Sequence, residues 1–271
     1  MSKIDVVFSA CGRPDTKYCQ YNLDIHYSTF SVAKFLPWVR YIWIIVPDGW
    51  DKPITGEKIK IIKETTIVPK KYLPTHNSNV VESWIWKLQG LSDQFIYMCD
   101  DMYIGKPCSP EDFFVNKKPI LRLYDGPPNY PPLTNLQNTI PYVRMWANAV
   151  EKYGFQYTRI QHQALPLKKS LMKKYYLQYK KEVDTASENI TRKGELDFNL
   201  MRFTSPLSVM NGESYLLVTR DDTDFFVEGG DFERQKKILK IKPKFFCINN
   251  NSMGNKKVYV LLKKYFNKEF S

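Results

Sequence analysis

The feature that most constrains this chain is the stretch from residue 73 to residue 105, LPTHNSNVVESWIWKLQGLSDQFIYMCDDMYIG. Asn79 and Glu82 lie three residues apart and resemble a capping box, so they predict the start of a helix. Gly90 is a natural helix end. The apolar run over residues 95–99 then predicts a short strand covered on both faces, which is typical of a parallel sheet.

Two adjacent carboxylates, Asp100 and Asp101, follow this strand directly. In open parallel α/β sheets, ligands bind in the crevice outside the carboxyl ends of the strands. Adjacent carboxylates repel each other unless a positive charge lies beside them. Mg²⁺ is commonly held by one or two carboxylates together with phosphate oxygens. The pair therefore predicts a Mg²⁺ or Mn²⁺ site, although a solvated turn or a helix cap would have the same sequence.

The first part of the chain alternates strands and helices. Buried strands are predicted over residues 4–8 and 41–46, a more exposed strand over 58–62, and a helix over 23–35. This order favours an α/β fold with a mostly parallel, Rossmann-like sheet flanked by helices. The chain has no GxGxxG after the first strand and no GxxxxGK[ST], which argues against a dinucleotide oxidoreductase and a P-loop NTPase.

The remainder of the chain is expected to complete a single catalytic domain over residues 1–271, with a helical insertion over roughly residues 139–205. Four prolines between residues 125 and 132 predict a loop beside the active site. A Lys- and Tyr-rich helix is expected after His162. The other predicted elements are strands over 120–124, 215–219 and 245–248, helices over 139–152 and 197–203, and a C-terminal amphipathic helix.

Charge and cysteine usage limit the function classes. Forty Lys and Arg against 28 Asp and Glu give a formal charge of +12, which attracts phosphorylated or nucleotide-bearing ligands. No nucleic-acid-binding signature accompanies this charge. The five cysteines form no metal-binding spacing and are expected to be reduced thiols. Neither a signal peptide nor a membrane-length apolar run is present, so a cytoplasmic chain, either free or peripheral at a membrane, is expected; a homo-oligomer is left open.

The stretch over residues 73–105 resembles the Stealth family of sugar-phosphate transferases, which includes bacterial capsular polysaccharide phosphotransferases and the animal GlcNAc-1-phosphotransferase. The second region of that family resembles LPTxNSxxxExxxxxxxGLSxxFIYxxDDxxxG. The preceding segment KFLPWVRYIWIIV and weaker matches around residue 5, residue 162 and residue 250 extend the resemblance along nearly the whole chain. The positions that match the second region are Leu73, Pro74, Thr75, Asn77, Ser78, Glu82, Gly90, Leu91, Ser92, Phe95, Ile96, Tyr97, Asp100, Asp101 and Gly105.

The resemblance implies transfer of a sugar 1-phosphate from a nucleotide sugar, such as UDP-GlcNAc, to a hydroxyl of an acceptor glycan. Nucleoside monophosphate would be released, and a divalent metal would be needed. Asp101, together with Asp100, would hold the metal or orient the acceptor. His162 would be the general base on the acceptor hydroxyl or a donor to the phosphate. Arg192 and Arg159 would neutralise phosphate oxygens.

The resemblance also implies a group of residues that orient the nucleotide or support the neighbouring loop. Several positions depart from the family pattern: Ala10 stands where a Trp is usual, Gly12, Arg13 and Pro14 replace Asp-Gly-Ser, and Asn250 stands where an Asp is usual. The implied substrate- and nucleotide-binding residues are Asp5, Asn77, Ser78, Glu82, Arg159 and Asn250.

Two other functions agree with parts of the sequence. A metal-dependent glycosyltransferase of the GT-A type would also hold a nucleotide diphosphate at acidic residues after a strand, but it releases nucleoside diphosphate. A catalytically decayed protein that binds nucleotide sugars or polyanions would agree with the positive charge and with the departures from the family pattern. Analysis of the nucleotide product separates these alternatives from the transferase.

Overall fold

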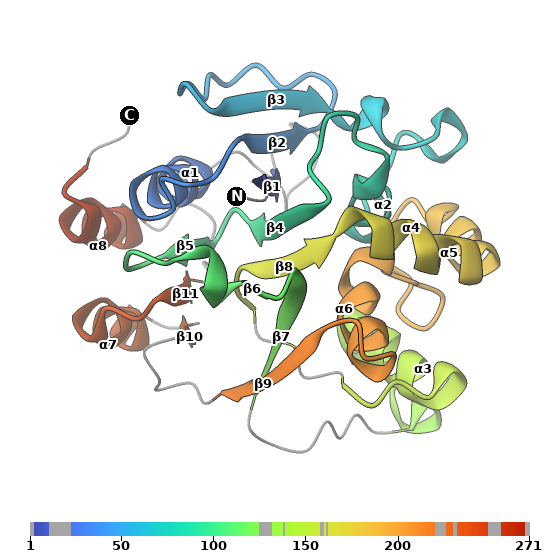
Figure 1. The fold of residues 1–271 in the computed structure, drawn as a ribbon. Coiled ribbons are helices and arrows are strands. Elements are labelled where there is room, and N and C mark those ends of the chain that lie inside the picture. Colours follow the sequence, from blue (N-terminus) through green and yellow to red (C-terminus); the bar gives the residue numbers. More distant parts are fainter. Residues whose placement is uncertain are drawn as a thin grey trace.

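The centre of the fold is a five-stranded sheet (Figure 1). Four neighbouring strands run parallel, and the fifth, at one edge, runs antiparallel. The strand order is β3 (Ile59–Lys63), β2 (Ile42–Val46), β1 (Ile4–Ser9), β4 (Gln94–Cys99) and β8 (Leu165–Lys168). The computed structural model describes residues 3–10, 23–124, 132–137, 139–157, 160, 162–219, 226–229, 232–248 and 256–268.

The two faces of this sheet carry separate cores, because successive side chains of a strand point to opposite faces. The face that includes Val6 packs against α1 (Asp24–Phe35). The face that includes Val7 packs against three helices on the other side of the sheet: α2 (Ser78–Ser83), α4 (Lys169–Gln178) and α6 (Leu200–Met210).

Two small sheets flank the central one. β5 (Met102–Ile104) begins directly after Asp101 and pairs antiparallel with β11 (Phe245–Ile248), which pairs parallel with β10 (Phe226–Gly229). The chain thus leaves the central sheet and joins a second one at Asp101. The third sheet consists of β6 (Phe114–Val115), β7 (Lys118–Tyr124) and β9 (Tyr215–Thr219).

The remaining helices complete the layers. α8 packs beside α1, where Phe266 stacks on Tyr27 with ring centroids 6.2 Å apart (Figure 1). α3 ends at Gly154, whose φ of 67° is a left-handed conformation that a glycine adopts without strain. Their bounds are α3 (Pro141–Tyr153), α5 (Lys180–Ser187), α7 (Phe232–Ile241) and α8 (Lys256–Phe266).

The structure confirms the predicted fold class, an α/β fold whose mostly parallel sheet is flanked by helices. One strand was not predicted. Residues 165–168, which precede the predicted Lys- and Tyr-rich helix, form β8. Pro166 pairs opposite Ile96 in this strand. Because β8 is an edge strand, the missing N–H of the proline costs little there. The helix that follows is divided into α4 and α5.

Other boundaries differ from the prediction for local reasons. α2 is shorter than expected and continues as a 3-10 turn at Ile85–Lys87 before Gly90. Residues 139–205 are mainly helical, but they also supply β8 to the central sheet. Of the loop predicted over 125–132, all but Pro132 lies outside the described residues.

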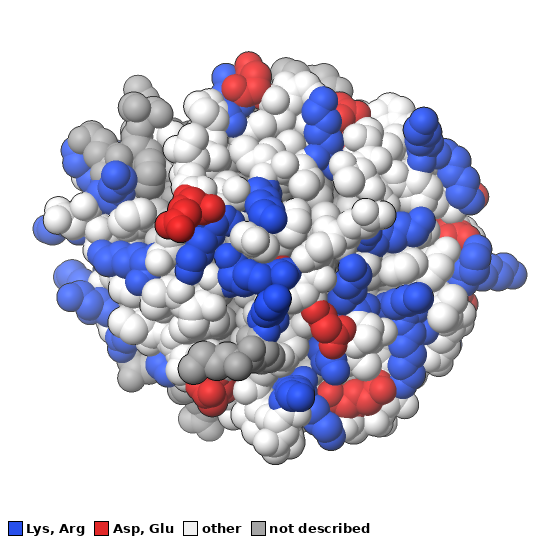
Figure 2. Space-filling view, turned by 45° about the horizontal axis from the view of Figure 1, so that its top comes forward, with Lys and Arg blue, Asp and Glu red and all other residues white. Residues whose placement is uncertain are grey.

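The surface is broadly basic. Figure 2 shows Lys and Arg side chains spread over much of one face, with fewer acidic side chains between them. Within the described residues, no helix is long and apolar enough to cross a membrane. The cysteines that the structure describes, Cys99, Cys108 and Cys247, are free thiols.

Candidate active site

The site is assembled where β4 ends. In the antiparallel register of β8 and β4, Tyr97 pairs with Leu165, so the chain before Leu165 runs back along the residues that follow Tyr97. That register places His162 beside the Asp100–Asp101 turn. From the other side, the backbone N–H of Ile248 donates to the carbonyl oxygen of Asp101 at 3.0 Å. Segments far apart in the sequence therefore meet at the carboxyl ends of the parallel strands.

Three side chains converge at the carboxyl ends of these strands. Ligand atoms of Cys99, Asp101 and His162 all lie within 4.8 Å of one another. His162 Nε2 is 3.8 Å from Asp101 Oδ1, and its Nδ1 is 3.4 Å from the sulfur of Cys247. Asp101 Oδ1 is buried, yet no described residue donates a hydrogen bond to it. Buried carboxylate oxygens that accept no hydrogen bond are rare in folded proteins, so this oxygen is available to a water molecule, a hydroxyl or a cation.

The charges of this cluster shift the titration of its members. Burial lowers the pKa of His162, whereas the neighbouring Cys247 and Asp101 raise it, and the resulting pKa lies well above the ordinary value. His162 therefore favours the imidazolium form, which suits a hydrogen-bond donor better than a general base. Perturbed titratable groups in one place are typical of functional sites.

Asp24 is a member of the site that sequence reasoning did not identify. Its side chain is buried, and it accepts a hydrogen bond from the hydroxyl of Tyr103 at 3.2 Å. Burial, with the negative charge of Asp101, raises the pKa of Asp24 to about 7. Its place as the first residue of α1 resembles an ordinary favourable charge at a helix N-terminus, so the sequence offered no signal that set it apart.

A buried polar network supports the cluster from the α2 side. Glu82 accepts hydrogen bonds from the Tyr97 hydroxyl at 2.8 Å, from Asn199 Nδ2 at 2.6 Å and from Arg202 Nε at 3.2 Å. Arg202 also points Nη2 at the sulfur of Cys99, 3.6 Å away. Glu82 thus holds Arg202 against the cluster, which agrees with a supporting role rather than with direct contact to substrate.

The same network continues to the start of α2. Asn77 caps this helix by accepting a hydrogen bond from the backbone N–H of Asn79, and both amides donate to the buried Asp197. Ser78 accepts a hydrogen bond from the guanidinium of Arg192, whose side chain is exposed. Arg192 thus lies at the start of α2 and is joined to the cluster only through intervening residues.

Asp5 lies at the opposite end of the sheet. It pairs with Phe95 in the β1–β4 register, four residues before the Ser9–Cys99 pair. Its buried carboxylate accepts from Arg40 Nε at 2.8 Å, from Trp43 Nε1 at 3.1 Å and from the backbone N–H of Ser92 at 2.9 Å. The structure therefore separates Asp5 from Asp101 and His162. Arg159 and Asn250, also predicted as binding residues, lie outside the described residues.

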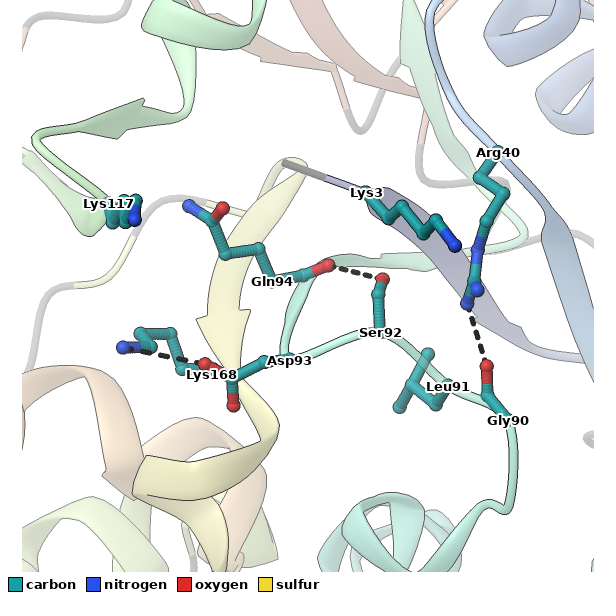
Figure 3. A pocket seen from close by; sticks show the side chains of 9 residues that line it. All are labelled: Lys3, Arg40, Gly90, Leu91, Ser92, Asp93, Gln94, Lys117 and Lys168. Atoms are coloured by element: carbon teal, nitrogen blue, oxygen red, sulfur yellow. Dashed lines mark hydrogen bonds and ion pairs between the residues drawn. The ribbon is translucent and has the colours of Figure 1, made fainter. Parts of the chain in front are cut away.

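A pocket lies at this opposite end (Figure 3). It has a volume of about 400 Å³ and is lined by basic side chains such as Lys3 and Lys117. Its other cations are already engaged, because Arg40 donates to the carbonyl of Gly90 and Lys168 pairs with an aspartate of the rim. The pocket is therefore distinct from the converging side chains at the carboxyl ends of the strands.

A divalent cation fits part of the predicted ligand set. Asp101 provides a buried oxygen that accepts no hydrogen bond from the described residues and is of the kind that Mg²⁺ or Mn²⁺ takes. Asp100 is not among the side chains that converge at the cluster. A hard cation such as Mg²⁺ would therefore bind Asp101, and most of its other oxygen ligands would come from a bound diphosphate and from water.

Comparison with known proteins places these residues in a family. Residues 18–121 match the family model for Stealth protein conserved region 2, which includes Asp100 and Asp101 but not His162 or Arg192. The matched region therefore contains the part of the site that follows β4, and it ends within β7. The remaining half comes from the chain beyond it.

Several capsular polysaccharide phosphotransferases match most of the chain. The one from Haemophilus influenzae is 31% identical over 280 residues, covering 95% of this chain and 74% of that protein. A relative from Neisseria meningitidis serogroup B is 29% identical over 248 residues, covering 86% and 66%. Another from Neisseria meningitidis is 26% identical over 275 residues, covering 93% and 74%. On the strength of the Haemophilus match and the conserved region, this chain belongs to the Stealth family, among its capsular polysaccharide phosphotransferases.

Proposed function

We propose that this chain carries out phosphotransfer in capsular polysaccharide synthesis and that the transferred group is a sugar 1-phosphate. The donor would be a nucleotide sugar of the UDP-GlcNAc kind, and the acceptor a hydroxyl of a glycan. The observation that carries the proposal is the approach of His162 Nε2 to Asp101 Oδ1, 3.8 Å apart, at the carboxyl ends of the parallel strands. A positively charged imidazolium and a negatively charged carboxylate, placed together at the carboxyl ends of the strands, suit transfer at a diphosphate.

The proposed reaction needs charge neutralisation and positioning more than covalent chemistry. The acceptor oxygen forms a bond to the phosphorus that carries the sugar, and the bond from this phosphorus to the nucleoside monophosphate breaks. The Asp101 carboxylate orients the acceptor hydroxyl and takes up its proton. His162, in its protonated form, donates from Nε2 to an oxygen of the transferring phosphoryl group, where negative charge is spread in the transition state.

A divalent cation has a place in this proposal. Mg²⁺ or Mn²⁺, when bound, would neutralise charge on the diphosphate and on the leaving phosphate. Asp101 would hold it, because a carboxylate has two oxygens and can serve a cation and a hydroxyl together. Asp100 remains the second predicted ligand, and it would need to turn toward the cluster to reach the same ion.

Arg192 would act at a different part of the donor. Its exposed guanidinium is anchored by Ser78 at the start of α2, and a planar guanidinium binds phosphate oxygens in a bidentate manner. The polar network from Asn77 through Glu82 to Arg202 would keep this segment fixed relative to the Asp101 cluster. Arg192 would thus serve donor binding, whereas His162 would serve the chemical step.

The nucleotide product tests the proposal. The chain is incubated with candidate nucleotide sugars, Mg²⁺ and a capsular oligosaccharide acceptor, and the released nucleotide is identified by chromatography. Nucleoside monophosphate is expected. We expect His162→Ala to lower kcat by roughly 10²–10⁴-fold, the usual share of acid–base catalysis. Arg192→Ala is expected to raise KM for the donor more than it lowers kcat, and the exposed Arg234→Ala serves as the matched control.

Two results would contradict the proposal. Release of nucleoside diphosphate would identify a glycosyltransferase instead. Binding of nucleotide sugar without any turnover, whatever acceptor is offered, would identify a binding protein. Equal activity of wild type and His162→Ala would remove His162 from the chemical step even if nucleoside monophosphate were the product.

A further inference from the structure

We propose that the pocket at the amino ends of the strands is a binding site for a phosphodiester-linked glycan chain, separate from the active site. The pocket is the hollow of about 400 Å³ that Lys3, Gln94 and Lys117 help to line (Figure 3). The inference rests on the proposed function for the identity of the chain, because transfer of sugar 1-phosphate to a hydroxyl forms a phosphodiester. The binding itself needs neither nucleotide sugar nor turnover, so it can be tested separately.

Three separate segments bring these side chains to the pocket. Lys3 directly precedes β1, and Gln94 is the first residue of β4. Asn116 and Lys117 form the two-residue turn between β6 and β7, and their φ angles of 49° and 63° are of the kind that a tight hairpin turn requires. β4 is six residues long, at about 3.3 Å for each residue, so the pocket lies roughly 20 Å from the Asp101 end of the strand. It is therefore a site of its own.

The charge of the pocket is not balanced within it. Two of its cations are engaged with aspartates, Arg40 at 2.8 Å and Lys168 at 3.4 Å. Among the described residues, no carboxylate pairs with Lys3 or with Lys117. Figure 3 shows the Lys3 side chain pointing toward that of Arg40, so like charges converge there. Because converging cations repel each other unless an anion lies between them, the pocket favours a negatively charged ligand.

Gln94 adds a neutral polar group between the charges. The residue is only 6% exposed, and its side-chain amide forms no hydrogen bond with the residues that the structure describes. Figure 3 shows this amide extending into the space between Lys3 and Lys117. Buried amides without hydrogen bonds are rare. An amide both donates and accepts, which suits a sugar hydroxyl or acetamido group, whereas a phosphate accepts only. The order of cation, amide and cation therefore matches a sugar with a phosphate on each side.

The rest of the lining argues against two other polyanions. Single-stranded nucleic acids are bound by stacking their bases on aromatic side chains, and the described lining contains no aromatic residue. Attachment to a lipid surface needs apolar side chains that reach into the bilayer boundary. The apolar residue of the described lining, Leu91, is buried. A phosphodiester-linked glycan needs neither feature.

Binding of a defined oligosaccharide to the full chain, without nucleotide sugar, tests the site. The probe is a fluorescent oligosaccharide of GlcNAc repeats joined by phosphodiesters. The double variant Lys3→Gln, Lys117→Gln is expected to weaken its binding by at least roughly 10-fold, whereas Lys3→Arg, Lys117→Arg is expected to retain it. The matched control is Lys173→Gln with Lys237→Gln, which removes the same charge from exposed helix positions. Its affinity is expected to differ from wild type by less than about 2-fold, because distant exposed charges are screened by salt.

The neutral part of the ligand has its own comparison. A GlcNAc oligosaccharide of the same length, joined by ordinary glycosidic bonds, is expected to bind weakly and to respond to neither pair of lysine changes. Gln94→Leu keeps the bulk of the side chain and removes its amide. It is expected to weaken binding of the charged oligosaccharide by roughly 3–10-fold, the usual share of a neutral hydrogen bond or two.

Lysine labelling of the wild type locates the bound chain without any variant. With the charged oligosaccharide present, Lys3 and Lys117 are expected to lose most of their reactivity toward acetylation, measured by peptide mass analysis. Lys173 is expected to react as before. This measurement separates binding at the pocket from binding of the same probe at the active site.

Several results would overturn the site. Equal weakening in the two Lys→Gln double variants would show that the whole basic surface binds the chain. Unchanged labelling of Lys3 and Lys117 would place the chain elsewhere. Single-stranded DNA of the same charge, or vesicles containing phosphatidylglycerol, might be bound with the same dependence on these two lysines, and the pocket would then belong to another class of ligand. Release of nucleoside monophosphate at the active site would still stand in each case.

Discussion

At the two ends of the central sheet, a buried aspartate has opposite hydrogen-bonding surroundings. At the amino ends of the strands, Asp5 accepts hydrogen bonds from Arg40, Trp43 and the backbone of Ser92. Burial raises the pKa of Asp5, but these hydrogen bonds outweigh it and the pKa lies below the ordinary value. At the carboxyl ends, Asp101 Oδ1 is buried without a donor among the described residues.

The comparison distinguishes Asp5, a carboxylate that stabilises the fold, from Asp101, a carboxylate that is available to bind a ligand. A carboxylate whose hydrogen bonds are satisfied within the protein contributes to stability and has little capacity left for substrate. One that is buried and unsatisfied costs stability, and such strain is typical of functional sites. Asp5 and Asp101 lie near the ends of adjacent strands, so local sequence context alone would not separate them.

The largest expected effect is on activity at the carboxyl end. We expect Asp101→Asn to lower kcat/KM by roughly 10³-fold, because it removes the charge that orients the acceptor and holds the cation. The melting temperature is expected to change little, because the repulsion toward Asp24 and the attraction to His162 are removed together. Initial rates of nucleotide release and differential scanning fluorimetry measure the two quantities. Loss of folding together with activity would place Asp101 with Asp5 as a stabilising residue.

A second expected effect is a pH dependence of stability at the same end. Burial raises the pKa of Asp24 to about 7, from its ordinary value of 3.8, so the folded protein holds a proton that the unfolded chain has lost. Stability is therefore expected to fall as pH rises from about 4 to about 7 and to level off above that. Between pH 5 and pH 7, the loss is at most about 2.7 kcal/mol, at 1.36 kcal/mol for each pH unit.

Denaturant unfolding with EDTA present, at several pH values, measures this loss. Asp24→Asn cannot lose a proton, so its stability is expected to vary less over the same range. If the wild type and Asp24→Asn changed in parallel between pH 5 and pH 7, the pH dependence would come from other groups.

A third expected effect is the loss of stability at the amino end. Asp5→Asn keeps the shape but removes the charge that Arg40 binds, which is expected to cost about 1.5–3 kcal/mol of unfolding free energy. Because Asp5 accepts charge-assisted hydrogen bonds only in the folded state, the difference from wild type is expected to narrow as pH falls through the lowered pKa of Asp5.

Activity for each folded molecule is expected to be unchanged in Asp5→Asn. The exposed Asp51→Asn, on the surface, is the matched control and should alter stability by less than about 0.5 kcal/mol. A large fall in the activity of folded Asp5→Asn would restore the nucleotide-binding role that the resemblance implied for Asp5.

The sequence predicted much of the fold because the required signals are local. Apolar runs over β1, β2 and β4, alternating with helical segments, predicted a mostly parallel sheet, and the structure confirms it. The prediction missed β8, because its four residues contain a proline and precede a strongly helical segment. That error matters, since the β8–β4 register is what places His162 beside Asp101.

The candidate site was predicted in part, for the same reason. Asp101 and His162 were named from the family resemblance, and the structure brings them together. Asp24, Cys99 and Arg202 were not named, since each resembles an ordinary helix-end charge, strand residue or surface cation when viewed alone. Their contacts with Asp101 or with one another cross many residues of chain, and local periodicity carries no information about such pairs.

By itself, the sequence determined the order of the first strands and helices, the family, and the acidic pair that follows β4. The tertiary structure alone decided which carboxylate is satisfied and which is held open. It also decided that a thiol, a carboxylate and an imidazole lie together at the carboxyl ends of the strands. The reason is that burial and hydrogen bonding depend on partners supplied by distant segments: Arg40 and Ser92 for Asp5, and β8 with β11 for Asp101. Only folding brings those segments into contact.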